Sequence, residues 1–236
     1  MAGDRRDRIV ERLAADSAHS GDSTRLCDVC AEITSMTGAG IMLMSGEIAR
    51  GSVCTTNDVS ALIEQLQYDL GEGPCVDAYH GDRPVLEPDL AQPTVSRWLA
   101  FRGPAIDAGV RAVFGFPLRV GAVRLGALNL YRDEPGDLAD EQHADALAMA
   151  DVAAEAVLLL QASAPPGRLA VELETGANFQ YVVHQASGMV AAQLDVSVAQ
   201  ALIRLRAYAF GNGRSLTEVA KAVVARELRL DDGAQG

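Results

Sequence analysis

The sequence lacks several features that would assign it to a special class of protein. It has no apolar run of the roughly 18–20 residues that a membrane-spanning helix needs. No apolar stretch follows its charged start, Met1–Arg8, as a signal peptide would require. Its 9 prolines and 22 glycines are too few for a disordered or fibrous chain. With 49% hydrophobic residues, the composition predicts a globular, cytoplasmic protein with no membrane partner.

Cysteine is scarce, and its four positions do not complete a metal site. Cys27 and Cys30 form a Cys-x-x-Cys pair, a spacing that occurs in zinc and redox sites. No second pair and no nearby histidine complete a tetrahedral set, and the pair lies inside a helical run. We therefore expect no metal and no cofactor. We also expect reduced cysteines, with Cys27 and Cys30 packing a helix.

The charge is distributed unevenly along the chain. The formal net charge is −12. Residues 179–230 hold six basic and three acidic side chains, a local charge of +3 that leaves −15 on the remainder. A basic island on an acidic protein is typical of a surface that binds a polyanion. The alternative is an ordinary solvated helical surface.

Hydrophobic periodicity predicts a first domain of the α+β class, with a central antiparallel sheet flanked by helices. The helices are expected over 24–37, 57–70 and 140–161, and the strands over 39–44, 48–55, 84–87, 112–118 and 125–131. In the second helix, the predicted buried stripe is Val59, Leu62, Ile63, Leu66 and Leu70.

The predicted domain boundaries follow from composition. Residues 1–20 are charged and polar and are expected to form a loosely held helix or tail. Residues 21–162 form the α+β domain, and Ser163–Gly167, rich in proline, begins a linker over 163–178. Residues 179–230 form a second, all-α domain of three helices. Within the long helix, Val152–Leu160 is apolar around most of its circumference, which predicts a second packing partner and favours a homodimer.

Two capping boxes mark helix starts in the second domain. Ser197 precedes Gln200 by three residues, and Ser215 precedes Glu218 by three. Such pairs satisfy two helix N-terminal N–H groups reciprocally. Together with an apolar periodicity from Val182 to Leu194, they predict three short helices. Within the second of these, Val198, Leu202, Leu205 and Ala209 are expected to point inward.

Two sets of segments resemble known families. The first domain resembles a GAF-type sensory domain in Leu70–Tyr79, Arg83–Val85, Gly109–Leu118 and Leu125–Tyr131. The second resembles an ANTAR domain, an RNA-binding antitermination module, in His184–Val190, Ala201–Ala207 and Ser215–Val224. This resemblance implies a transcription antitermination regulator that binds paired RNA hairpins as a homodimer under the control of a GAF sensor, and that is not an enzyme.

The residues of the helical domain fit that expectation. Arginine and lysine hold phosphates, and tyrosine or arginine planes stack on bases that are splayed out of an RNA loop. Arg214 and Ser215 stand at a helix N-terminus, which favours a phosphate. Arg206 could instead form a salt bridge within the domain, and Ser215 could serve only as a cap. The predicted RNA-contact residues are Arg204, Arg206, Tyr208, Arg214, Ser215 and Lys221.

The effector of the sensory domain is not identified by any motif. The resemblance implies a pocket for an unknown small molecule, between the sheet and its covering helices. Cys75 follows Pro74 at a helix start, where the dipole could lower the thiol pKa, although a buried structural role is the simpler reading. The predicted lining residues are Cys75, Trp98, Phe101, Phe114 and Phe116.

Two other functions remain open at this point. The second and third helices of the all-α domain, joined by Gly211–Arg214, could imitate a DNA-binding helix-turn-helix. Some GAF-type proteins reduce free methionine sulfoxide, which here would require Cys54 and Cys75 to meet across a pocket.

Overall fold

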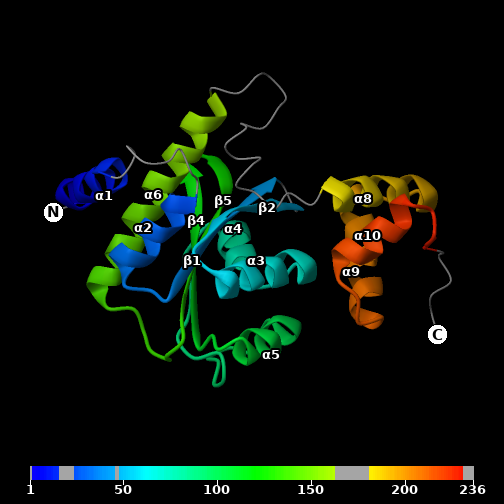
Figure 1. Cartoon of the computed structure of the whole chain (residues 1–236), viewed down its shortest axis with the longest axis horizontal. Coiled ribbons are helices and arrows are strands. Elements are labelled where there is room, and N and C mark those ends of the chain that lie inside the picture. The colour runs from blue at the N-terminus through cyan, green and yellow to red at the C-terminus, as the bar shows by residue number, and fades with distance from the viewer. Residues whose placement is uncertain (1, 16–23, 46–47, 163–180, 231–236) are drawn as a thin grey trace. The chain divides into compact units, whose positions relative to one another are not determined.

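The computed structural model describes residues 2–15, 24–45, 48–162 and 181–230. These residues form two compact units (Figure 1). The first unit contains the sheet with helices α1 to α6, and the second contains helices α8 to α10.

A five-stranded antiparallel sheet forms the centre of the first unit, with strand order β2-β1-β5-β4-β3. The β4–β5 connection is a tight hairpin, in which Gly121 has a φ of 58° and so occupies the left-handed region that favours glycine. The predicted strands and their hairpin are confirmed. The strands are β1 (Gly38–Ser45), β2 (Ile48–Thr55), β3 (Val85–Glu87), β4 (Ala112–Val120) and β5 (Val123–Arg132).

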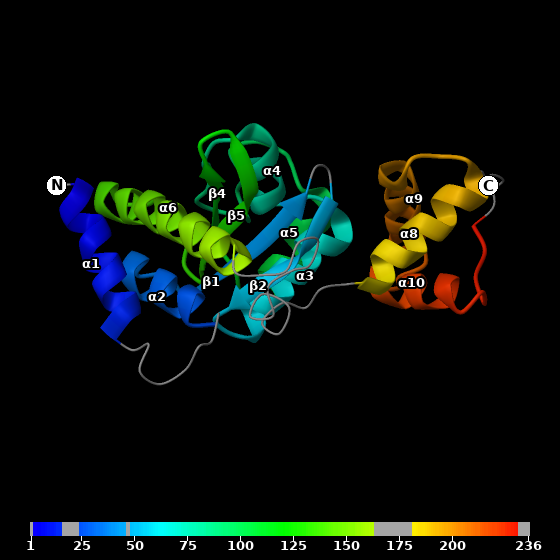
Figure 2. The ribbon, with the colours of Figure 1, turned by 90° about the horizontal axis from the view of Figure 1, so that it is seen from above.

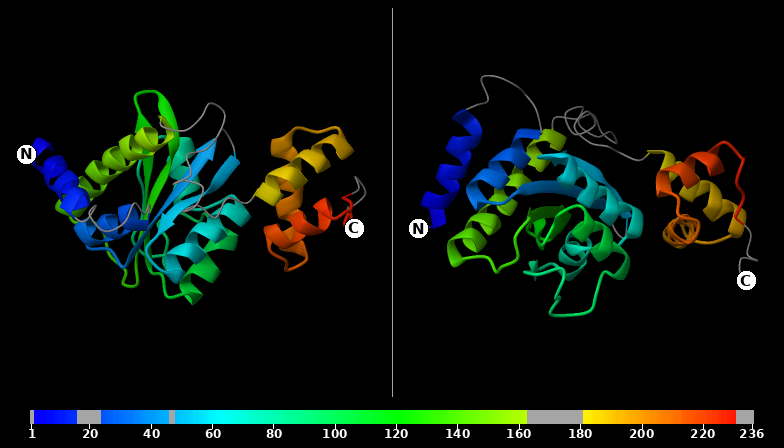
Figure 3. Two further views of the ribbon diagram at one scale, coloured as in Figure 1. Left: turned by 45° about the horizontal axis from the view of Figure 1, so that its top comes forward. Right: turned by 60° about the horizontal axis from the view of Figure 1, so that its bottom comes forward.

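One face of the sheet packs against α2 (Thr24–Thr34) and α6 (Asp140–Ala162). Figure 3 shows these two helices lying side by side over the strands. Phe116 of β4 makes an edge-on ring contact with His143 of α6, with 5.6 Å between the ring centroids. Apolar side chains that alternate along β1, β4 and β5 are fully buried on this side, which makes it the main hydrophobic core.

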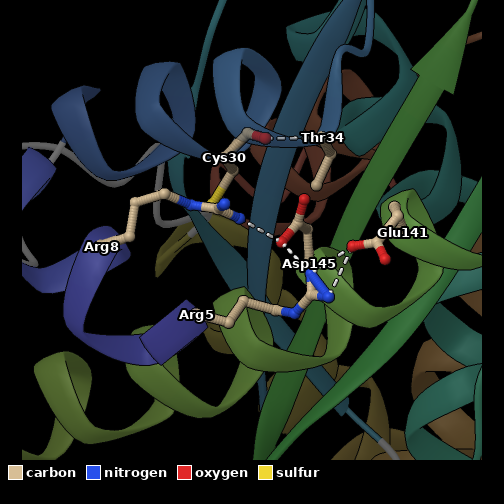
Figure 4. Close-up of polar contacts among 6 residues, drawn as sticks. All are labelled: Arg5, Arg8, Cys30, Thr34, Glu141 and Asp145. Atoms are coloured by element: carbon tan, nitrogen blue, oxygen red, sulfur yellow. Dashed lines mark hydrogen bonds and ion pairs between the residues drawn. The ribbon is translucent and has the colours of Figure 1, made fainter. Parts of the chain in front are cut away.

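Helix α1 (Ala2–Ala15) packs on α6 and is held by ion pairs. The side chain of Asp145 is buried, at 8% exposure. Its Oδ1 atom forms ion pairs with guanidinium nitrogens of Arg5 and Arg8, each at 2.7 Å (Figure 4). Ile9 is completely buried. The expectation of a loosely held segment is therefore wrong for residues 2–15. The stripe of α1 that carries Arg5, Ile9 and Arg12 was too short for periodicity alone to show that it is docked.

A disulfide joins Cys27 of α2 to Cys54 of β2, with 5.9 Å between the Cα atoms. The expectation that these two cysteines are reduced is wrong. Cys54 is paired with Ile41 in the sheet register, which turns it toward the helix α2. The sequence could not show that a helix residue and a strand residue 27 positions apart face each other. Cys30 and Cys75 are free and buried.

The other face of the sheet packs against α4 (Pro74–Gly81), and α3 (Asp58–Leu70) approaches it where Glu64 lies over Gly40; α5 (Leu99–Asp107) lies beside them (Figure 3). Asn57 begins α3 as predicted, because its Oδ1 accepts a hydrogen bond from the Ser60 N–H at 2.9 Å. The predicted buried stripe of α3 is largely wrong. Ile63 is buried, but Leu62 is 41% exposed, and the side turned inward carries Ser60, Glu64 and Gln67.

The second unit is a three-helix bundle in which α9 and α10 both pack on α8 (Figure 2). Both predicted capping boxes are present, at Ser197 and Ser215. Leu202, Leu205 and Ala209 are buried as predicted, whereas Val198 is 43% exposed because it lies in the first turn of its helix, beyond the reach of the bundle core. The helices are α8 (Tyr181–Leu194), α9 (Val198–Gly211) and α10 (Leu216–Val224).

Within the described ranges, no single helix is long and apolar enough to cross a membrane. By length and composition alone, α8 and α9 together, bent by 106°, form one pair that could.

We expect loss of the disulfide to lower the stability of the protein. Replacing both bonded residues, Cys27→Ser with Cys54→Ser, should reduce the free energy of unfolding by about 3 kcal/mol, because the unfolded chain gains loop entropy. Urea unfolding with and without dithiothreitol measures this. The reductant should destabilise the natural protein and leave the double variant unchanged; equal responses would contradict the bond.

Candidate functional site

Two of the exposed cationic groups of the second unit lie at or near the start of α10. Arg214 precedes the helix and Lys221 lies on its second turn, and both are exposed. Glu218 lies between them at helical spacing. The pKa of Glu218 is lowered, chiefly by its hydrogen bonds to Ser215 and further by the charges of Arg214 and Lys221. The two cations therefore lie on one exposed side of this helix.

The N-terminus of α10 is capped by its own side chains. The Ser215 hydroxyl accepts a hydrogen bond from the Glu218 N–H at 3.2 Å, and the Ser215 N–H donates to Glu218 Oε2 at 3.0 Å. These bonds use two of the donors that a phosphate would need, and they place a carboxylate at the helix start. Ser215 thus acts as a cap, and Arg214 and Lys221 remain the groups able to hold a phosphate.

Helix α9 presents a mixed outward side. Arg204 is exposed, whereas Arg206 and Tyr208 are half-buried. Two apolar side chains that the sequence did not single out are exposed on the same helix, Ile203 at 63% and Phe210 at 67%. The sequence could have revealed this pair. Residues seven apart lie two turns apart on the same side of a helix, and this side is opposite to the one that carries Leu202 and Leu205.

The sheet divides the predicted effector-pocket residues into two groups. Phe114 and Phe116 face α6, where Phe116 meets His143, so these two do not line a pocket with Cys75. Trp98 and Phe101 lie on the opposite side with Cys75. There the indole N–H of Trp98 donates to Asp77 of α4 at 3.0 Å.

A buried polar cluster, which the sequence did not predict, lies between the sheet and α3. We define it as Glu64, Gln67 and Asn129, which are 2%, 0% and 1% exposed. Asn129 is the β5 residue paired with Gly40 of β1 on one side and Gly115 of β4 on the other. The absence of side chains at these glycines leaves room for the polar side chains above Asn129.

Helices α3 and α4 close over this cluster. A Cβ on Gly40 would lie 2.6 Å from Glu64 Oε1, and one on Gly115 would lie 2.4 Å from the Pro74 carbonyl oxygen. Gln67 accepts a hydrogen bond through Oε1 from the Cys75 N–H at 2.7 Å. Among the described residues, neither carboxylate oxygen of Glu64 forms a hydrogen bond of normal geometry, and Asn129 is the side chain close enough to influence the carboxyl.

Burial governs the protonation of this region. It raises the pKa of Glu64 to about 8, against a smaller lowering effect of Asn129. Burial, reinforced by the nearby Glu64, also raises the pKa of the Cys75 thiol, although its contact with Gln67 opposes the shift. The helix start at Pro74 therefore does not activate Cys75, whose thiol stays protonated. Within the described ranges, no three acidic, histidine or cysteine side chains group as a metal site would require.

Comparison with known families matches both units. The GAF domain family model matches residues 23–157, more than half of the chain, and the ANTAR domain model matches residues 172–224. The chain belongs to the GAF family and carries an ANTAR domain. The order of the two domains is the one that the sequence segments predicted.

Solved structures support the fold of the GAF domain. The chain is similar to the GAF domain of a phosphoenolpyruvate-protein phosphotransferase from Coxiella burnetii, with 13% identity, a TM-score of 0.50, and coverage of 67% of this chain and 95% of that one. The corresponding Acinetobacter domain gives 13% identity, a TM-score of 0.50, and coverage of 69% and 96%. A search of curated protein sequences gave no significant match.

The two domains set the general role of the protein. An ANTAR domain binds RNA in antitermination, and a GAF domain senses a signal, so the chain is an RNA-binding antitermination regulator with a sensor. This architecture is that of a regulator rather than of an enzyme.

We expect Glu64 to make the stability of the protein depend on pH. Its pKa rises from 4.5 to about 8 on folding, so the folded state holds the proton more tightly and stability falls as pH rises across that interval. The slope is at most about 1.4 kcal/mol per pH unit. Urea unfolding of the natural protein and of Glu64→Gln at pH 5.5 and 7.5 measures it. The free energy of unfolding of the variant should lack this dependence on pH. An equal change in the free energy of unfolding of both proteins between the two pH values would contradict a buried, protonated Glu64.

Proposed function

We propose that the ANTAR domain binds paired hairpins in nascent transcripts and prevents termination when the GAF domain permits it. The observation that carries this proposal is the exposure of Arg204, Arg214 and Lys221 on a helical unit that matches the ANTAR family. A cytoplasmic location suits a protein that acts on RNA during transcription.

The chemistry of these side chains suits folded RNA. Arg214 and Lys221 can hold neighbouring phosphates, because they extend from one side of α10. Arg204 and the exposed ring of Phe210, on α9, can stack on unpaired bases. Arg206 and Tyr208, which are half-buried, reach RNA with only part of their side chains.

We also propose that the protein acts as a homodimer through the end of α6. Helix α6, which contains the apolar segment Val152–Leu160, packs on α1, on α2 and on the sheet. Val152 and Val157 are buried in this way, but Leu159 is 73% exposed and remains available to a second copy.

The alternatives have less support. On α10, the side chains able to read bases in a DNA groove are Lys221 and the half-buried Thr217. A methionine sulfoxide reductase would need Cys54 to meet Cys75, and Cys54 is instead bonded to Cys27.

We expect Arg214→Ala with Lys221→Ala to weaken binding to a two-hairpin leader RNA by about tenfold or more at low salt. Loss of two phosphate contacts should also flatten the slope of log K against log salt by about one to two. Filter binding over a salt series measures both effects.

The matched control removes two exposed arginines from the GAF domain, Arg83→Ala with Arg119→Ala. It changes the net charge equally and should leave RNA affinity near that of the natural protein. Equal losses in the two variants would show that overall charge, and not this surface, governs binding. Tighter binding to a palindromic DNA duplex than to the hairpins would favour the helix-turn-helix alternative.

We expect Leu159→Arg to shift the protein from dimer to monomer, because a buried arginine without a partner opposes the interface. Light scattering after size exclusion gives the mass directly. Leu99→Arg on α5 is the control, since Leu99 is equally exposed, at 79%, and lies outside α6. A natural protein that is monomeric at micromolar concentration would contradict the dimer.

A further inference from the structure

We propose that the cluster of Glu64, Gln67 and Asn129 binds a small uncharged molecule with adjacent N–H and C=O groups, as in a lactam or a ureide, and that this molecule is the signal of the sensor. The inference rests on the sensory role of the GAF domain in the proposed function.

Several buried polar atoms of this cluster lack well-formed hydrogen bonds. Both oxygens of Glu64, the Nε2 atom of Gln67, and both amide atoms of Asn129 lack a hydrogen bond of normal geometry within the part of the chain that the structure describes, although Asn129 lies close enough to Glu64 to lower the pKa of its carboxyl. Each of these side chains is at least 98% buried. Folded proteins satisfy nearly all such groups, because each unsatisfied one lowers stability. Five unsatisfied atoms in one place therefore point to a ligand that satisfies them.

Residues from both the sheet and α3 form this cluster. The sheet contributes Asn129 between two glycines, and α3 buries Glu64 and Gln67 while Leu62 is exposed and Leu66 and Leu70 are only half-buried. A helix that only had to cover a sheet would bury its leucines. Gln67 is fixed in orientation by the Cys75 N–H, which leaves Nε2 as a positioned donor.

The cluster offers a defined pattern of hydrogen-bond donors and acceptors. Asn129 presents one donor and one acceptor side by side, which pair with a C=O and an N–H on adjacent ligand atoms. Gln67 adds a donor for a second carbonyl. Glu64, when protonated, adds one donor and one acceptor in the same planar arrangement. A ring that alternates N–H and C=O groups complements this set.

The neutral character of the ligand follows from the surroundings. The described ion pairs include none with Glu64, and burial keeps its carboxyl protonated near neutral pH. An anion would find no cation there, and a cation would first have to displace the proton. An uncharged ligand enters without either cost.

The test measures binding of defined probes to the full-length protein without RNA. Uracil and 2-pyrrolidinone are the neutral probes, and methylammonium is the cationic one. At pH 6.5 a neutral probe at millimolar concentration should raise the melting temperature and give saturable binding by ligand-observed NMR. Its affinity should fall as pH rises past about 8, where Glu64 loses its proton. A cation held by ionised Glu64 would show the opposite trend.

Two variants separate a binding role from a structural one. Asn129→Leu should weaken probe binding by about tenfold or more, while the melting temperature without probe stays equal or rises because unsatisfied amide atoms are removed. Glu64→Gln should retain binding and make it independent of pH, since the amide keeps one donor and one acceptor. Asn212→Leu, in the ANTAR domain, is the matched control and should bind the probes as the natural protein does.

The outcomes that overturn the inference are distinct from failure of RNA binding. Absence of saturable binding by both neutral probes, selective binding of methylammonium, or unchanged binding in a correctly folded Asn129→Leu variant would each refute it. Because no RNA is present, a protein that binds the probes but not hairpins would refute the proposed function and leave the ligand site intact.

Discussion

The close approach of α3 and α4 to a glycine-lined strip of the sheet is the constraint on which the sensory domain depends. At Gly40 and Gly115, a single added carbon would lie within 2.6 Å of Glu64 and 2.4 Å of the Pro74 carbonyl, respectively. A Cβ atom does not lie this close to a non-bonded atom, so a side chain at Gly115 would force the backbone of α4 away, and one at Gly40 would displace the side chain of Glu64. The space that these glycines leave is what allows a carboxyl and two amides to lie inside an otherwise apolar domain.

The two faces of the sheet consequently differ in the polarity of the side chains that they bury. On the side of α6 the contacts are between fully buried apolar side chains, and the disulfide of Cys27 with Cys54 links α2 covalently to β2. Toward α3 the contacts are polar and incompletely satisfied. Apolar burial and the disulfide suit the first face to stabilising the domain, and the buried polar groups suit the second face to recognition.

The sequence predicted the elements better than their orientations. The strands, the β4–β5 hairpin, and the caps at Asn57, Ser197 and Ser215 follow from local chemistry, and all were predictable. The site was harder to predict because its determinants are nonlocal. The leucines of α3 suggested the wrong buried side, since periodicity cannot reveal that glycines lie opposite. Register also decided that Cys54 faces Cys27, and that Phe116 faces His143 instead of Cys75.

The docking of α1 has a practical consequence for how the sensory domain is isolated. The GAF family match starts at residue 23, so a fragment cut at that boundary would omit α1 altogether. Asp145 would then lose Arg5 and Arg8 together, and the surfaces of α6 and α2 on which α1 packs would be exposed to solvent. A carboxylate without its arginine partners, next to a newly exposed apolar patch, favours self-association of the fragment. Biophysical work on this domain should therefore begin at the first helix and not at the family boundary.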